Sequence, residues 1–254
     1  MFVATQCAGK MAKQEIKNSA LNNIRLVWEL FQLNLKIIFA DKFFLFLLAA
    51  FLFFIFVTLI ILFGSDANPT DESVYYLLLF PGILLIAYPT IFGIQNDADS
   101  RTLEVLFGIP NYRYKVWLVR FVFIYIIVFM LMFVLGALSY VAITYFSIFK
   151  MTYQLMFPIF FLGSVAFMFS TVIRNGYGTA VVMVVIGLFF WVMSEGLVES
   201  KWNLFLNPFH VPANVSEIVW ADIMMKNRIY LVVGTVLSLL WGLLNLQKRE
   251  KFVS

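Results

Sequence analysis

The chain has 254 residues, of which 63% are hydrophobic and 13% are charged, and its formal net charge at pH 7 is +4. A soluble domain is about 45–50% apolar and about 25% charged, so this composition excludes a soluble enzyme or a soluble binding domain. We infer a polytopic membrane protein from which no soluble domain of about 100 residues can be separated.

The N-terminal residues divide into a polar tail and a helical pattern. Residues 1–20 lack the apolar core segment of a signal peptide and are expected to form a cytoplasmic tail. From residue 22 to residue 38, polar residues recur at a helical period opposite an apolar face, which predicts an amphipathic helix lying in the membrane interface. Its characteristic residues are Arg25, Trp28, Glu29, Gln32 and Lys36. The alternative is a cytoplasmic extension of the first span.

Six apolar segments are long enough to cross a hydrocarbon core of about 30 Å, which takes about 20 residues of helix. Lipid offers no hydrogen-bond partner to a backbone group, so an all-α fold is expected. The predicted spans are residues 43–63, 74–95, 116–146, 151–173, 177–198 and 229–246. Residues 21–254 are thus expected to form a single transmembrane domain.

The basic residues predict the orientation of these spans. If both termini lie in the cytoplasm, the outer loops contain only Lys150, Lys201, Lys226 and Arg228 out of 18 Lys and Arg residues. Positive residues concentrate on the cytoplasmic side of membrane proteins, so this orientation is favoured. The net charge of +4 then reflects topology, and no nucleic-acid partner is expected.

A charged segment follows the second span. Asp99 or Ser100 suits a helix start, and Pro110 would end the helix. The segment carries the charges of Asp97, Asp99, Arg101 and Glu104, and apolar Leu103, Leu106 and Phe107 recur at helical spacing. These features predict a short cytoplasmic helix within residues 97–109. An interfacial helix that merely covers the end of the bundle is the alternative reading.

The longest predicted outer segment covers residues 199–227 and is rich in aromatic residues, with Pro208 and Pro212 as breaks. Aromatic residues of this kind concentrate at the level of the lipid headgroups. We therefore expect two short helices that dip into the outer leaflet, with an ordinary aromatic-rich loop as the alternative.

The sequence gives little support to an enzyme. It has no P-loop motif for ATP, no recognisable nucleophile motif and no metal-ligand spacing. A lipid-modifying enzyme would depend on Glu195, Glu199 and His210, the outer candidates for acid–base chemistry. Within the spans, the ionisable residues are Glu195 and Arg120, and Arg120 is interpreted as a side chain that snorkels to the interface. An ion-driven transporter usually has mid-membrane carboxylates, so transport would draw its energy from another subunit.

Two segments resemble the membrane subunits of ABC-2 type exporters. The first cytoplasmic loop of that family commonly reads E-R-E-x-G-T-L-E, followed by apolar residues, a Pro and basic residues. Asp97, Asp99, Thr102, Leu103, Glu104, Pro110, Arg113 and Arg120 occupy corresponding places here, whereas Arg101 stands where the family usually has Gly. The outer segment Leu206–His210 also resembles the family's N-P-F/L stretch before the last span.

The resemblance implies a permease that moves substrate outward between two protomers. Two copies of a separate ATPase would bind ATP and Mg²⁺, and this chain would need no cofactor of its own. The coupling helix would contact the ATPase through Asp97, Asp99, Arg101, Thr102, Leu103, Glu104, Leu106, Phe107 and Pro110. The outer gate would be formed by Asn207, Pro208, Phe209 and His210.

The same resemblance implies the surroundings of the chain. The second protomer would be an identical or related permease, and membrane lipids would cover the rest of the surface. A bacterial or archaeal plasma membrane is the expected location. The main alternative function is a scaffold or assembly factor that does not transport and that binds a different cytoplasmic protein through residues 97–109.

Overall fold

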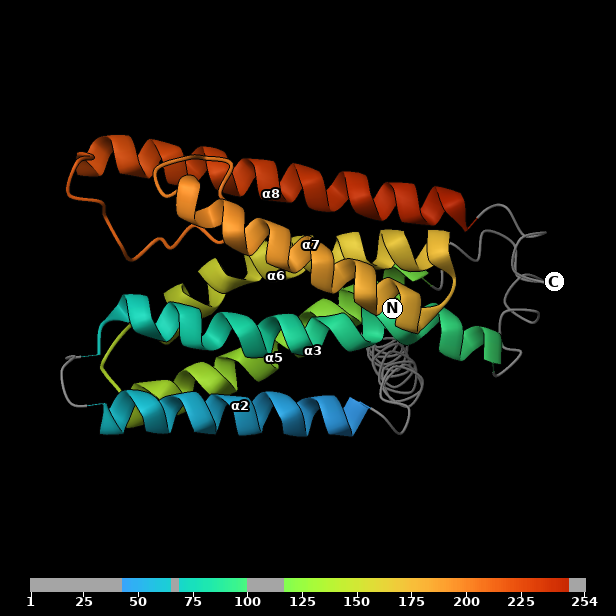
Figure 1. The fold of residues 1–254 in the computed structure, drawn as a ribbon, viewed down its shortest axis with the longest axis horizontal. Helices are drawn as coiled ribbons and strands as arrows, with labels where there is room; N and C mark the ends of the chain where they lie inside the picture. The colour runs from blue at the N-terminus through green and yellow to red at the C-terminus, as the bar shows by residue number, and fades with distance from the viewer. Residues whose placement is uncertain (1–42, 65–68, 100–116, 247–254) are drawn as a thin grey trace, which may run out of the picture. The chain divides into compact units, whose positions relative to one another are not determined.

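The computed structural model describes residues 43–64, 69–99 and 117–246 (Figure 1). Their helices are α2 (Phe43–Phe63), α3 (Asp71–Asp99), α5 (Val119–Ala142), α6 (Ile148–Ile173), α7 (Gly176–Gly196) and α8 (Glu217–Asn245). All six are long and apolar enough to cross a membrane, and these ranges contain no strand. The prediction of an all-α chain with six spanning helices is confirmed for this part, while the predicted interfacial helix at 22–38 lies outside the described residues.

Successive helices run in opposite directions, as expected for a chain that crosses a membrane repeatedly (Figure 1). The Asp71 end is where α3, α6 and α8 begin, and the Phe43 end is where α2, α5 and α7 begin. Because the number of crossings in the described unit is even, α2 starts and α8 finishes at the same end of the molecule.

Helices α3 and α6 form the centre of the packing. In the most apolar stretch of each helix, the share of residues that are buried is 72% for α3 and 61% for α6. The corresponding share is 17% for α2 and 11% for α7. Helix α3 packs against α2, α5, α6 and α7, and α6 packs against α3, α5, α7 and α8. The outer helices α2 and α7 expose apolar residues along much of their length, as helices do when they face lipid.

Glycine allows α3 and α6 to approach closely. A Cβ atom on Gly163 of α6 would lie 2.5 Å from Cδ1 of Ile86 on α3. The same arrangement occurs with the two helices exchanged, because a Cβ atom on Gly82 of α3 would lie 2.3 Å from Cδ1 of Ile159 on α6. Helices in lipid gain little from apolar burial alone, so the close contact that small residues permit is a main source of their association.

Several predicted helix boundaries differ from those in the structure. The predicted long span 116–146 ends at Ala142, and Ser147 then caps α6 by accepting a hydrogen bond from Lys150 N at 3.5 Å. The predicted last span begins at Ile229, whereas α8 begins at Glu217. Polar residues near the water do not end a helix whose backbone hydrogen bonds continue, so hydropathy understated the length of α8.

The expectation of two short helices within 199–227 was also wrong. Residues 197–216 contain turns and bends but no helix, and residues 217–227 belong to α8. The aromatic residues that suggested contact with the outer leaflet pack against neighbouring helices. Trp202 stacks on Tyr230 of α8 with ring centroids 4.5 Å apart, and Phe205 is buried beside Trp191 of α7.

Candidate functional site

The structure distributes the predicted site residues unequally. Asp97 and Asp99 belong to α3, which continues as one helix past the predicted span end at Gln95. Asp99 is the last described residue before the gap at 100–116, so the predicted helix start at Asp99 or Ser100 extends outside the described residues. Arg101, Thr102, Leu103, Glu104, Leu106, Phe107 and Pro110 lie outside the described residues, as do Arg25, Trp28, Glu29, Gln32 and Lys36. The predicted outer gate, Asn207–His210, is described and lies at the Asp71 end.

Two asparagines shape the loop of residues 197–216. The side-chain oxygen of Asn203 accepts from Phe205 N at 3.0 Å, and that of Asn207 accepts from Phe209 N at 3.0 Å. The amide nitrogens of the same side chains reach other elements: Asn203 donates to Ser194 O on α7, and Asn207 donates to Glu72 O on α3. Asparagine carries both an acceptor and donors, so each residue makes a turn and anchors it to a helix.

The first turns of α3 hold the same loop. Tyr75 Oη donates to Leu206 O at 3.3 Å, and the Tyr75 ring lies 6.1 Å from that of Phe209. His210 Nδ1 lies 2.8 Å from Glu72 Oε2. Together with the Asn207 hydrogen bond, these contacts join the beginning of α3 to the predicted gate residues.

Arg228 lies beneath the loop and is only 8% exposed, although the sequence placed it among the outer loop residues. Its guanidinium donates to Gln154 Oε1 at 2.9 Å, Asn227 Oδ1 at 3.1 Å and Leu206 O at 3.4 Å. It also lies 5.2 Å from the centre of the Phe157 ring. A buried charge is costly unless its donors are satisfied, and these groups satisfy it while fixing α6, α8 and the loop together.

The interpretation of Arg120 as a snorkelling residue was wrong. Arg120 is 4% exposed, and its guanidinium lies 5.0 Å from the centre of the Trp117 ring. Gly93 of α3 faces both side chains, because a Cβ atom there would lie 4.0 Å from each of them. The small residue on α3 leaves room for the Arg120 side chain inside the bundle, which a reading of α5 alone does not show.

A cavity of about 410 Å³ lies beside the loop at the Asp71 end. Its walls come from the beginning of α3, the end of α7, the loop and the first turns of α8. Aromatic residues contribute much of the lining, and Glu195 and His210 are its ionisable members. Of the three residues of the enzyme alternative, the structure thus brings two to one cavity and leaves Glu199 out.

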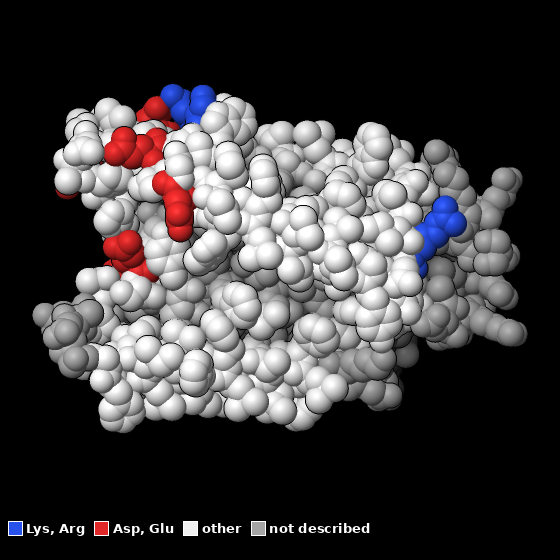
Figure 2. All heavy atoms as spheres, viewed as in Figure 1, with Lys and Arg blue, Asp and Glu red and all other residues white. Residues whose placement is uncertain are grey.

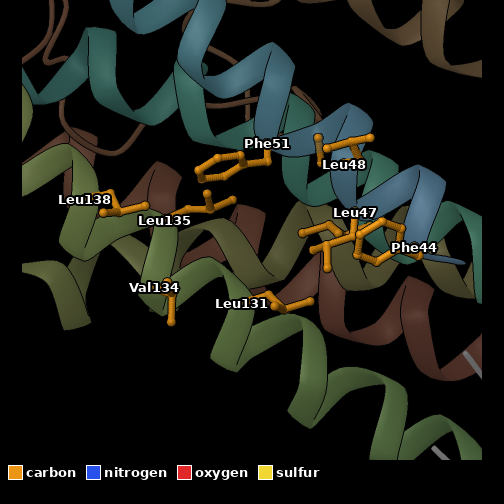
Figure 3. A pocket seen from close by; sticks show the side chains of 10 residues that line it. Phe44, Leu47, Leu48, Phe51, Leu131, Val134, Leu135 and Leu138 are labelled. Atoms are coloured by element: carbon orange, nitrogen blue, oxygen red, sulfur yellow. The ribbon is translucent and has the colours of Figure 1, made fainter.

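A second, smaller space lies between α2 and α5, and Leu85 of α3 also lines it (Figure 3). Its volume is about 280 Å³, and its lining consists entirely of apolar side chains, among them Phe44, Phe51, Leu131 and Leu138. A lining without polar groups can accommodate an acyl chain or an apolar side chain but cannot orient a polar ligand.

The charges of the described residues are concentrated at the Asp71 end. On the face shown in Figure 2, acidic side chains gather at this end. Its described cations are engaged: Lys226 pairs with Asp222 at 2.6 Å, Lys150 lies over the Phe209 ring, and Lys201 lies over the rings of Trp202 and Tyr230. Within the described ranges, no three His, Cys, Asp or Glu side chains come together in a way that could hold a metal ion.

Comparisons with known proteins return no family model, no curated protein and no solved structure that matches this chain. The fold and the geometry of its two ends are therefore the basis for any functional conclusion.

Proposed function

We propose that this chain is the permease subunit of an ATP-driven exporter whose ATPase is a separate protein. The observation that carries the proposal is the continuity of α3 from Asp71 to Asp99. One end of this helix enters the segment that resembles an exporter coupling helix, and its other end is bonded to the predicted outer gate.

Helix α3 is suited to carry a displacement across the bundle. It packs against four of the other helices, so a force applied at the Phe43 end acts on the core rather than on a peripheral element. Close-packed helices transmit displacement because few voids are available to absorb it. In the proposed mechanism, closure of the ATPase moves the coupling segment, α3 shifts with it, and the contacts of Tyr75 and Asn207 move the gate.

The energy source in this proposal is the partner because the described spans have few groups for ion coupling. Their acidic residues are confined to helix ends, such as Asp71, Glu72 and Glu195. Carriers driven by protons or sodium ions usually place carboxylates or broken helices near the bilayer midplane. ATP and Mg²⁺ would be bound by two ATPase copies, and substrate would pass between two permease protomers.

The test is to purify the full chain in a mild detergent from its native membrane and to identify what accompanies it. The proposal expects an ATPase, recognised by peptides covering a G-x-x-x-x-G-K-[ST] motif, in an amount equal to the permease. An intact chain that carries no ATPase, even after gentle crosslinking through residues 97–109, would contradict the exporter. Capture of another cytoplasmic protein through those residues would favour the scaffold alternative.

A further inference from the structure

The cavity at the Asp71 end has a wall that suits one chemical class of ligand. Four aromatic side chains line it from four different segments: Tyr76 of α3, Trp191 of α7, Phe205 of the loop and Trp220 of α8. Glu195, in the last turn of α7, supplies a carboxylate. The volume of about 410 Å³ falls within the range of roughly 300–1,000 Å³ that is typical of small-molecule sites.

The electrostatics of this cavity favour a cation. Glu195 forms no salt bridge with any cation in the described ranges. Of the cations at this end, Lys226 pairs with Asp222, Lys150 and Lys201 lie over aromatic rings, and Arg228 donates to neutral groups. His210 also lines the cavity, but it lies 2.8 Å from Glu72 Oε2. The His210–Glu72 pair is neutral when the imidazole is protonated and negative when it is not. Among the residues that line the cavity, Glu195 thus carries a charge that no described ion pair neutralises.

Aromatic rings attract cations because the faces of their π systems are electron-rich, and quaternary ammonium groups are commonly recognised in this way. We propose that this cavity binds an alkylammonium group, held by the rings of Tyr76, Trp191 and Trp220 and by the Glu195 carboxylate. The ammonium is either that of a free organic cation or that of a phospholipid headgroup at this end of the helices. Binding here does not depend on whether an ATPase docks at the other end.

Two further observations support a built site. The loop that forms one wall is fixed by the hydrogen bonds of Asn203 and Asn207, both of which are buried. Trp220 is 5% exposed, and its indole N–H has no acceptor among the described residues. The burial of Trp220 and the anchored loop hold this wall in place.

The first experiment titrates choline into the full-length protein in dodecyl maltoside, which has no ammonium group, and measures binding by calorimetry. The matched probe is 3,3-dimethylbutan-1-ol, which has the shape of choline but no charge. Saturable binding of choline with no binding of the alcohol is expected. Trp191→Leu should weaken choline binding by about 2- to 30-fold, and Glu195→Gln should weaken it by up to about 5-fold. Both residues are exposed, so their replacement should leave folding intact.

The control variants are Trp241→Leu and Glu217→Gln, which change an exposed tryptophan and an exposed glutamate that do not line the cavity. They should bind choline like the parent protein. Thermal unfolding of all four variants checks that each remains folded.

The second experiment separates the two sources of the ammonium group. The parent protein and the Trp191→Leu and Glu195→Gln variants are placed in nanodiscs of mixed phosphatidylcholine and phosphatidylglycerol, and the lipid retained by each is identified by native mass spectrometry. Selective retention of phosphatidylcholine that both variants reduce identifies the headgroup as the ligand. Choline binding without such retention identifies a free cation. The proposal is overturned if neither is observed, or if the alcohol binds as tightly as choline.

Discussion

At the scale of single residues, the strongest constraints come from polar side chains that are buried. Arg228 is 8% exposed, and each of its hydrogen bonds goes to a neutral group. No single partner fixes its charge, so its position depends on α6, α8 and the loop being assembled at the same time. Hydrogen bonds to charged groups contribute about 1.5–3 kcal/mol each when their geometry is good.

Replacing Arg228 with Met keeps the aliphatic bulk and removes every donor. The buried Asn227 and the part-buried Gln154 would then lose their guanidinium partner, and we expect the free energy of unfolding to fall by about 1–3 kcal/mol. Arg228→Lys should restore little of this loss, because an ammonium group cannot reproduce the planar fork of a guanidinium. Thermal unfolding in detergent, followed by circular dichroism, measures the change.

Lys226→Met is the matched control for that variant. Lys226 lies two residues away on the same helix, but its salt bridge with Asp222 is exposed. Exposed ion pairs contribute little to stability because solvent screens them, so this variant should unfold close to the parent protein. Equal stability of Arg228→Met and Lys226→Met would refute a structural role for the buried guanidinium.

At the scale of elements, the contact between α3 and α6 organises the described unit. Both helices have most of their apolar stretch buried, and Gly82 and Gly163 let them approach. The neighbour that a Cβ atom on Gly163 would meet is Ile86, which is fully buried and has little room to move. This contact should therefore be sensitive to a single added methyl group.

Gly163→Ala should lower the free energy of unfolding by about 1–3 kcal/mol, which is the usual cost of forcing extra atoms into a packed interior. Gly187→Ala provides the comparison, because a Cβ atom at Gly187 on α7 would meet nothing within 4 Å. Alanine favours a helix over glycine, so the control should be neutral or slightly stabilised. Thermal unfolding in detergent measures both variants. If Gly163→Ala unfolds at the same midpoint temperature as Gly187→Ala, α6 can shift away from α3 at no cost in stability.

The proposed coupling through α3 predicts that changes at the Asp97 end of this helix affect docking of the ATPase. Reversing two charges with Asp97→Lys and Glu104→Lys should weaken docking of the ATPase, with an expected loss of about 10-fold in affinity, equivalent to about 1.4 kcal/mol. Asp97 lies beyond the apolar stretch of α3 that can span the membrane, so the bundle should remain folded. Stimulation of ATPase activity by reconstituted permease gives the readout.

Glu199→Lys with Glu217→Lys is the control, since it makes the same change in charge at the Asp71 end. Its ATPase stimulation should match that of the parent protein. Equal stimulation in the coupling variant as well would count against docking through residues 97–109.

At the scale of the whole molecule, the directions of the described helices and the positions of their charged side chains distinguish two ends. The described helices alternate in direction, and the acidic side chains on the visible face gather at the Asp71 end (Figures 1 and 2). The basic residues of the sequence favour a cytoplasmic position for the opposite end. The orientation prediction can therefore be tested with one residue from each predicted side.

Cys7 is the only cysteine of the chain, so it reports on the N-terminus without further engineering. In intact cells a membrane-impermeant maleimide should leave Cys7 unlabelled, and it should label Cys7 once the cells are made permeable. In a Cys7→Ser background, Ala213→Cys places the probe in the exposed loop before α8 and should be labelled in intact cells. The reverse pattern would invert the topology.

Much of the candidate site was beyond prediction from the sequence. The outer-gate role of the Asn207–His210 segment stays a prediction, and its contacts with Glu72 and Tyr75 were not foreseen. Glu195 was noted only as a potential catalytic group, His210 was noted also as a gate residue, and the aromatic wall around them was missed. A hint was available in the density of Trp and Phe between residues 189 and 209, which lipid contact seemed to explain.

By itself, the sequence determined the membrane class, the helical fold and the six spanning helices of the described residues, because each apolar run is local and must match the thickness of the bilayer. Only the tertiary structure decided that Arg120 and Arg228 are buried, that residues 197–216 pack as turns, and that a cavity forms beside them. These features depend on contacts between distant residues, such as Tyr75 with Leu206 and Arg228 with Gln154. A local pattern of hydropathy describes a helix and its surroundings, but not which helix becomes its neighbour.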